Sequence, residues 1–168
     1  MISVALDTNL LLLLVVGYAD PRNVERYKRT SMYRATDFAL LVDTIRNADR
    51  IVATPNALTE VSNLTKKGLA EPLSTAVRLS LKRVINEVHE SYRASRLACQ
   101  EPEFDRRGLC DTAWLGVIDS DTILVTDDGP LYRAALNRGM EALSLSHLRE
   151  EGRLVRRVSR KKRRRRRE

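Results

Sequence analysis

The sequence predicts an α/β fold in which helices cover both faces of a parallel sheet. Short apolar or β-branched segments alternate along the chain with longer segments whose apolar residues recur at helical spacing. When a helix connects two such strands, the strands form a parallel pair and the helix packs on the sheet. The 168 residues, 43% of them apolar, suit one domain with an ordinary core.

Four segments are expected to be strands because each is short, rich in apolar or β-branched residues, and followed by polar or turn-forming residues. They are residues 2–6, 50–54, 122–126 and 141–145. The first ends at Asp7 and has the continuous apolar character of a strand that is buried on both faces.

Helices are expected between these strands. Thr54 and Pro55 suit the cap and the first position of a helix. Gly17, Gly68 and Gly139 suit the ends of helices. Residues 10–17 are expected to form a helix or a turn. The other expected helices are residues 36–48, 55–67, 72–96, 109–119 and 130–138, with polar, irregular connections at 18–35 and 100–108.

The positive charge of the chain is concentrated near its C-terminal end. The formal net charge is +8, but residues 153–168 hold 11 Lys or Arg and one acid, whereas residues 1–152 hold 19 basic and 21 acidic residues. We therefore expect a nearly neutral domain at 1–152 and a disordered tail at 153–168, because like charges repel each other. The tail residues expected to bind nucleic acid through its phosphates are Arg160, Lys161, Lys162 and Arg163.

Several classes of protein are not expected. Cys99 and Cys110 form no disulfide framework, which indicates reduced thiols in a cytoplasmic protein. His89 and His147 are far apart and not matched to the cysteines, so a zinc site is not expected. The longest apolar run, residues 10–16, is shorter than the roughly 20 residues of a membrane span, and no Lys or Arg precedes it as in a signal peptide.

Acidic residues follow two of the expected strands. Asp7 comes directly after the first strand, and Asp127 and Asp128 come directly after the strand at 122–126. In open parallel sheets, ligands bind beyond the carboxyl ends of the strands. These acids from distant parts of the chain are therefore expected at the same edge of the sheet.

Two further acids lie among apolar residues of expected helices. Glu60 lies one turn inside the helix at 55–67, and Asp111 lies in the first turn of a later helix. An ionised carboxylate in such surroundings is costly unless it is paired or binds a cation. Structural alternatives exist for every acid: Asp111 could favour a helix start, Glu60 could be exposed, and the acids that follow strands could cap helices.

The gathering of several carboxylates predicts a site for hard divalent cations. Carboxylates in one cleft repel each other and take up protons unless cations compensate their charge. Oxygen ligands select Mg²⁺ or Mn²⁺, and such ions can activate a water molecule and stabilise the oxygens of a phosphodiester during displacement. This chemistry needs no His, Cys or Ser nucleophile.

Four short motifs carry these acids, and together they resemble a known family. They are Asp7-Thr8-Asn9, Ala57-Leu58-Thr59-Glu60-Val61, Gly108-Leu109-Cys110-Asp111-Thr112-Ala113 and Val125-Thr126-Asp127-Asp128. In this order, on an α/β background, they resemble the PIN-domain family over roughly residues 2–147.

The resemblance implies a three-layer α/β/α sandwich with a mainly parallel sheet of four or five strands. It also implies cleavage of single-stranded or structured RNA with Mg²⁺ or Mn²⁺. Asp7, Glu60 and Asp111 would then be catalytic metal ligands. Some members of this family are toxins of bacterial toxin–antitoxin pairs, which makes an antitoxin protein a further expected partner, although such toxins are often shorter and lack an arginine-rich tail.

The fourth acid is ambiguous in the sequence. The Thr-x-Asp spacing of the family selects Asp128 as the catalytic ligand, while Asp127 beside it could substitute for it or support it. Asn9 and Thr126 would orient the ligands through hydrogen bonds.

The connection at 18–35 mixes basic and aromatic residues. Its basic residues Arg22, Arg26, Lys28 and Arg29, interleaved with Tyr18, Tyr27 and Tyr33, suit contact with a nucleic-acid backbone and stacking on bases. An ordinary solvated insertion is the alternative.

Three functions are compatible with these features. The first is a divalent-metal-dependent endoribonuclease, and the second is a PIN-like module that binds RNA or protein without cutting. The third is phosphotransfer with Asp7 as nucleophile, which is disfavoured because Asn9 stands where a second acid is wanted. A homodimer could form through the helix at 72–96, whose apolar face could equally belong to the core.

Overall fold

The computed structural model describes residues 2–151. The expected basic tail at 153–168, with Arg160, Lys161, Lys162 and Arg163, lies outside these residues.

The described residues form a five-stranded sheet in which every neighbouring pair is parallel, in the order β3-β2-β1-β4-β5. The strands are β1 (Ser3–Leu6), β2 (Arg50–Ala53), β3 (His89–Glu90), β4 (Thr122–Thr126) and β5 (Ala142–Ser144). The apolar run of β1 is buried along its whole length, as a central strand covered on both faces requires.

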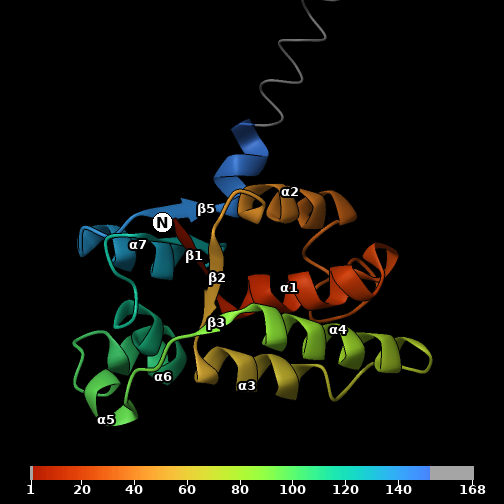
Figure 1. Ribbon diagram of the computed structural model, residues 1–168, viewed down its shortest axis with the longest axis horizontal. Helices are drawn as coiled ribbons and strands as arrows, with labels where there is room; N and C mark the ends of the chain where they lie inside the picture. The colour runs from red at the N-terminus through yellow and green to blue at the C-terminus, as the bar shows by residue number, and fades with distance from the viewer. Residues whose placement is uncertain (1, 152–168) are drawn as a thin grey trace, which may run out of the picture.

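Helices cover both faces of the sheet, which confirms the α/β fold class and the three-layer α/β/α arrangement. Figure 1 shows α1 to α4 gathered on one side of the strands and α5, α6 and α7 on the other. The helices are α1 (Thr8–Ala19), α2 (Ala35–Ile45), α3 (Pro55–Leu64), α4 (Leu73–Glu87), α5 (Ser95–Ala98), α6 (Phe104–Leu115) and α7 (Gly129–Asn137), with a 3₁₀ turn η1 (Pro21–Asn23) and a helical segment at 145–151.

The chain leaves the sheet in opposite directions from its two central strands. β1 leads into α1 on one face, and its neighbour β4 leads into α7 on the other (Figure 1). The carboxyl ends of such a pair of strands form a switch point, where connections diverge and ligands bind in parallel sheets. Asp7 follows β1 and Asp128 precedes α7, so both lie at this point.

The core is centred on α1. Every residue from Leu10 to Gly17 is buried, because this helix lies between the sheet and its neighbours α2, α3 and α4. A Cβ atom at Gly17 would lie 2.1 Å from Cδ2 of Phe38, so no larger residue fits where α1 meets α2. On the other side, the hydroxyl of Ser80 in α4 donates to the carbonyl of Val15 at 2.6 Å.

The prediction of one long helix at 72–96 is wrong. α4 ends at Glu87, β3 follows at once, and α5 is a separate short helix. β3 is an exposed edge strand held by backbone pairing with β2, and the amide of Ser91 continues the pairing by donating to Ala53 at 2.8 Å. Backbone pairing at an edge needs no apolar pattern, and the sequence therefore gave no signal for this strand. The apolar face of α4 packs on α1 and belongs to the core.

The helix expected at 109–119 begins earlier and ends earlier. α6 starts at Phe104 and ends at Leu115, so part of the connection expected at 100–108 is helical. Gly108 interrupts α6 with φ 72°, a backbone conformation that favours glycine. The turn that carries Asp111 therefore starts afresh after Gly108. No helix in the described part of the chain is long and apolar enough to cross a membrane.

Candidate active site

Asp7 caps the first helix at the edge of the sheet and is 4% exposed. Its Oδ1 accepts a hydrogen bond from the amide of Leu10 at 2.7 Å. Its Oδ2 accepts from the hydroxyl of Thr126 and from the amide of Asp127, the latter at 3.2 Å. Burial raises the pKa of Asp7, and these hydrogen bonds oppose the rise. Three of about four acceptor positions on the carboxylate are in use, which leaves one on Oδ1.

Thr126 joins the carboxyl ends of the two central strands. Its hydroxyl donates to Asp7 and accepts from the amide of Asp128 at 2.9 Å. Asp128 in turn caps α7, because its Oδ1 accepts from the amide of Leu131 at 2.6 Å. The side chain of Thr126 thus orients Asp7, and it also fixes the backbone that carries Asp128.

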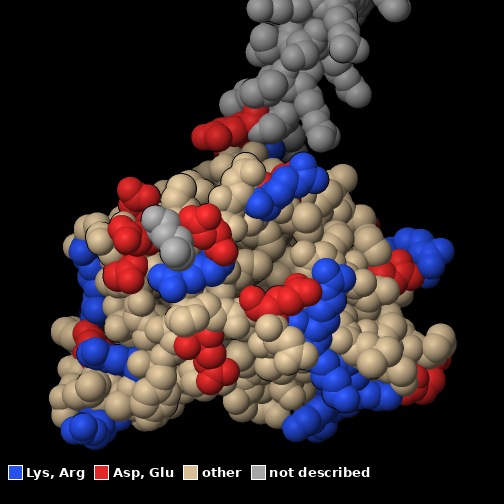
Figure 2. All heavy atoms as spheres, viewed as in Figure 1, with Lys and Arg blue, Asp and Glu red and all other residues tan. Residues whose placement is uncertain are grey.

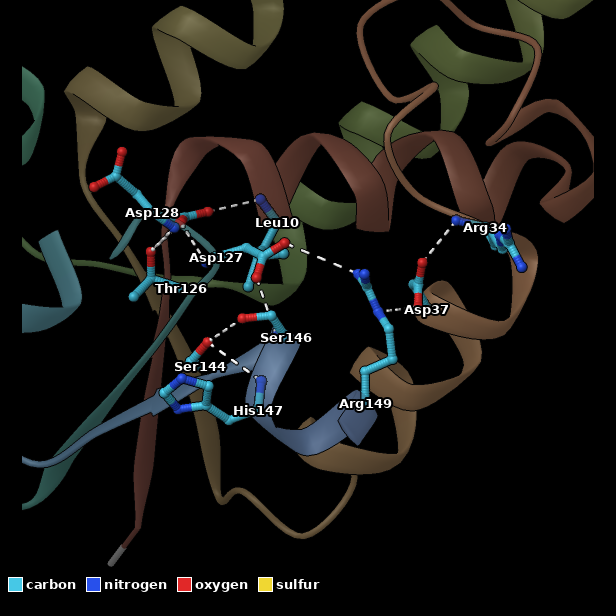
Figure 3. A network of polar contacts seen from close by, with 11 residues as sticks. Leu10, Arg34, Asp37, Thr126, Asp127, Asp128, Ser144, Ser146, His147 and Arg149 are labelled. Carbon is cyan, nitrogen blue, oxygen red and sulfur yellow. Dashed lines mark hydrogen bonds and ion pairs between the residues drawn. The ribbon is translucent and has the colours of Figure 1, made fainter. Parts of the chain in front are cut away.

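Asp127 points away from Asp128. Its Oδ1 accepts from the amide of Ser146 at 3.0 Å, and its Oδ2 lies 3.9 Å from the guanidinium of Arg149. Figure 3 shows both contacts reaching Asp127 from the helical segment at 145–151. Of the two candidates for the fourth ligand, Asp128 is therefore the better placed.

Glu60 approaches the same edge of the sheet from α3. Its Oε2 accepts a hydrogen bond from the hydroxyl of Thr8 at 3.1 Å, and Thr8 follows Asp7 directly. The Thr8 hydroxyl also lies 3.3 Å from the Sγ of Cys110. Burial raises the pKa of the Cys110 thiol to about 12, so the thiol keeps its proton at neutral pH. Cys110 is thus a packing neighbour of the acids rather than a thiolate ligand.

Asp111 is the acid with the least compensation. Its pKa is raised to about 6, first by burial and then by the negative charges of Asp128 and Asp7, while the nearby Arg107 lowers it by less. Glu60 adds a smaller contribution in the same direction. The carboxylate of Asp111 accepts no hydrogen bond from the residues that the structure describes. We call Asp7, Glu60, Asp111 and Asp128 the acidic rim.

The acidic rim offers the oxygen donors that Mg²⁺ and Mn²⁺ prefer, yet it is not a closed ligand set. Within residues 2–151, no group of three His, Cys, Asp or Glu side chains is arranged to hold an ion as the side chains stand. Asp7 and Asp128 each use oxygens to cap helices. Oxygen atoms that accept no hydrogen bond among the described residues remain on Glu60, Asp111 and Asp128. The chemistry of these donors therefore suits such a cation, whereas the present arrangement of the side chains does not enclose one.

Asn9 does not take part in this arrangement. It is exposed on α1, and its side chain makes no hydrogen bond within residues 2–151. The hydrogen bond expected from position 9 is instead made by Thr8, whose hydroxyl reaches Glu60. The sequence motif contains Thr8, but the spacing alone gave no reason to prefer it to Asn9.

The connection at 18–35 does not present two of its aromatic residues for stacking. Tyr27 and Tyr33 are 3% and 1% exposed, and the Tyr27 hydroxyl donates to the carbonyl of Leu64 at 2.5 Å. The expectation that they stack on bases is wrong, because both rings complete the core beside α1. Tyr18 is partly exposed and packs edge-on against Phe38.

The basic residues of this connection lie at the surface. Arg22, Arg26, Lys28 and Arg29 are exposed, and Arg22 pairs with Asp20 at 2.9 Å. On the face shown in Figure 2, side chains of both signs are scattered, with one group of basic side chains at the lower right and a group of acidic ones at the upper left. This pattern agrees with the nearly neutral charge of residues 1–152.

Sequence comparison identifies no relatives: no protein-family model matches the chain, and no curated protein is significantly similar to it.

Proposed function

We propose that this protein is a PIN-like endoribonuclease that depends on Mg²⁺ or Mn²⁺. One observation carries the proposal: Asp7, Glu60 and Asp128, which come from three separate segments, all lie near enough to Asp111 for their negative charges to raise its pKa. In proteins, crowded carboxylates without a basic partner are stable at neutral pH when a cation compensates them. The basic tail expected at 153–168 would favour a polyanionic substrate.

The residues of the acidic rim would hold the ion. Asp111 and Asp128 contribute oxygens with little competition from protein donors, whereas Asp7 contributes one remaining position on Oδ1. Hydrogen bonds from Thr126 fix the side chain of Asp7 and the backbone of Asp128 relative to each other, and a hydrogen bond from Thr8 restrains Glu60. A bound divalent cation would supply water activation and neutralisation of charge on the scissile phosphate.

Binding without cutting is the second candidate, and one feature favours it. Asp7 is largely occupied as a helix cap, and no three ligands in residues 2–151 already surround a common point. The near-complete hydrogen bonding and burial of Asp7 also argue against a phosphotransfer role for it, because a saturated carboxylate is a poor nucleophile.

The test measures the rate at which single-stranded RNA is cleaved. It compares the full chain with Mn²⁺, the full chain with EDTA, and the Asp111→Asn variant with Mn²⁺. Asp111→Asn removes a ligand charge without breaking a hydrogen bond among the described residues, and we expect it to lower the rate at least about a hundredfold. Asp105→Asn, an exposed acid in the same helix, is the matched control and should cut normally.

Asp7→Asn is a weaker test than Asp111→Asn. Asp7 accepts hydrogen bonds on both oxygens and an asparagine has only one acceptor oxygen, so loss of activity would mix a ligand effect with a local disturbance. Cleavage that continues in EDTA, or at full rate in Asp111→Asn, would contradict the proposal. Metal-dependent binding of RNA without any cleavage would favour the second candidate.

A further inference from the structure

A pocket of about 510 Å³ adjoins the acidic rim at the carboxyl ends of β2 and β3. It lies along the length of α3, between that helix, the segment that follows β3, and α6 just after its break at Gly108. Asn56 and Asn63 line it from α3, Tyr92 from the segment after β3, and Leu109 from α6. The volume is within the range of small-molecule sites.

The chemistry of this pocket suits a neutral, flat ring with polar edges. Tyr92 is 75% exposed and offers an aromatic face, and Leu64 and Leu109 add apolar surface. Asn56 and Asn63 provide hydrogen-bond donors and acceptors, and Lys66 at the margin of the pocket already donates to Oδ1 of Asn63 at 3.1 Å. The lining itself contains no Lys or Arg, and its one charged side chain, Glu60, would repel a phosphate.

The pocket is continuous with the proposed metal site. Glu60 is the one charged side chain in its lining, and it accepts a hydrogen bond from Thr8, next to Asp7. Cys110 also lines the pocket and directly precedes Asp111. A ring bound there would therefore place its attached sugar and phosphate toward the acidic rim.

Resting on the proposed function, we propose that this pocket binds one unpaired nucleobase beside the scissile phosphate, stacked on Tyr92 and read by Asn56 and Asn63. A base within a duplex has its polar edge paired and its faces stacked, so it cannot enter. The enzyme thereby selects single-stranded nucleic acid over duplex.

The first experiment uses uncharged probes, which the basic tail cannot attract. The ¹⁵N-labelled full chain is titrated with adenosine, with uridine and, separately, with inorganic phosphate. We expect either nucleoside to shift the side-chain amide signals of Asn56 and Asn63 and the backbone signal of Tyr92, and phosphate to leave these signals unchanged. Nucleosides that shift none of the three at millimolar concentration would overturn the proposal and leave the pocket to a protein partner.

The second experiment compares the dissociation constants of a labelled eight-nucleotide single strand in EDTA, where cleavage is absent. Stacking of one base on an aromatic ring contributes about 1–3 kcal/mol, so Tyr92→Ala should weaken binding about fivefold or more. Tyr92→Phe keeps the aromatic face and should bind nearly as the natural chain does. Leu79→Ala removes an exposed apolar side chain outside the pocket and is the matched control.

A duplex of the same length separates base insertion from charge. Its binding should be equal for the natural chain and Tyr92→Ala, because only unpaired bases reach the pocket. Equal single-strand binding by both proteins would overturn the inference, even if metal-dependent cleavage persists. A loss of cleavage in Asp111→Asn with the Tyr92 effect intact would support both proposals, whereas a Tyr92 effect without any metal-dependent cleavage would support the pocket alone.

Discussion

Two groups of acids lie near the same edge of the sheet, and they differ in their ion pairs. The acidic rim gathers Asp7, Glu60, Asp111 and Asp128, none of which forms an ion pair within residues 2–151, although the charge of Arg107 lowers the pKa of Asp111 somewhat. The second group, which we call the Arg149 network, contains Asp37, Asp127 and Arg149 (Figure 3).

The Arg149 network compensates its acids within the protein. Nε of Arg149 lies 2.8 Å from Oδ1 of Asp37, and its guanidinium also approaches Asp127. Oδ2 of Asp37 accepts from the amide of Arg34 at the start of α2. The network thus ties α2 and the end of β4 to the helical segment at 145–151, which is a structural role.

The difference between the two groups distinguishes Asp127 from Asp128, which the sequence alone could not do. Asp127 and Asp128 follow the last residue of β4, and their side chains make hydrogen bonds with different partners, Ser146 for Asp127 and Leu131 for Asp128. Asp127 therefore joins the Arg149 network, and Asp128 joins the acidic rim. An acid with its own cation stabilises the fold, and an acid without one is available for an external cation.

The largest expected effect on stability is that of Arg149→Met. Asp37 is 3% exposed, and removal of its partner leaves a buried carboxylate without compensation. We expect the free energy of unfolding to fall by about 3 kcal/mol, measured by denaturant titration at pH 7. The control is Arg46→Met, which breaks a pair with Asp43 in which both side chains are largely exposed and should cost well under about 1 kcal/mol. Equal losses in the two variants would mean that the Arg149 network is not a stabilising element.

A smaller effect of opposite sign is expected for Asp111→Asn in the absence of divalent cations. The folded protein raises the pKa of Asp111 from 3.8 to about 6, mainly by burial. Between these two values the folded state keeps a proton that the unfolded state has lost, so stability falls as pH rises through this window. Asparagine does not ionise, so the variant does not lose stability in this window. Above pH 6 its free energy of unfolding should exceed that of the natural chain by about 1–2 kcal/mol, or a few degrees in Tm.

Asp105→Asn is again the control for this measurement and should leave the pH dependence unchanged. If Asp111→Asn unfolds at the same temperature as the natural chain at both pH 4 and pH 7, the folded state does not disfavour the ionised form of Asp111. The distinction between the acidic rim and the Arg149 network would then lose its physical basis.

Much of the fold follows from local patterns in the sequence. The buried run that ends at Asp7, the cap and proline at Thr54-Pro55, and the strand at Thr122–Thr126 all lie where propensity and capping place them. These features were predictable because each depends on neighbours within a few residues. They also fixed the edge of the sheet at which Asp7, Asp127 and Asp128 would lie.

The remaining features depend on contacts between distant segments. β3 exists because its backbone pairs with β2, and neither His89 nor Glu90 contributes a buried side chain to signal it. Tyr27 and Tyr33 alternate with basic residues in the sequence, but their rings are buried in the core. Arg149 acts on Asp37 across more than a hundred residues, and no local pattern links them.

The central claim is that the acidic rim, and not the Arg149 network, binds divalent cations. Its most direct test is calorimetric titration of Mn²⁺ into the full chain, into Asp111→Asn and into Asp127→Asn, each first shown to be folded. We expect Asp111→Asn to weaken Mn²⁺ binding at least about tenfold and Asp127→Asn to change it less than about twofold. Unchanged affinity in Asp111→Asn, or a larger loss in Asp127→Asn, would contradict the claim.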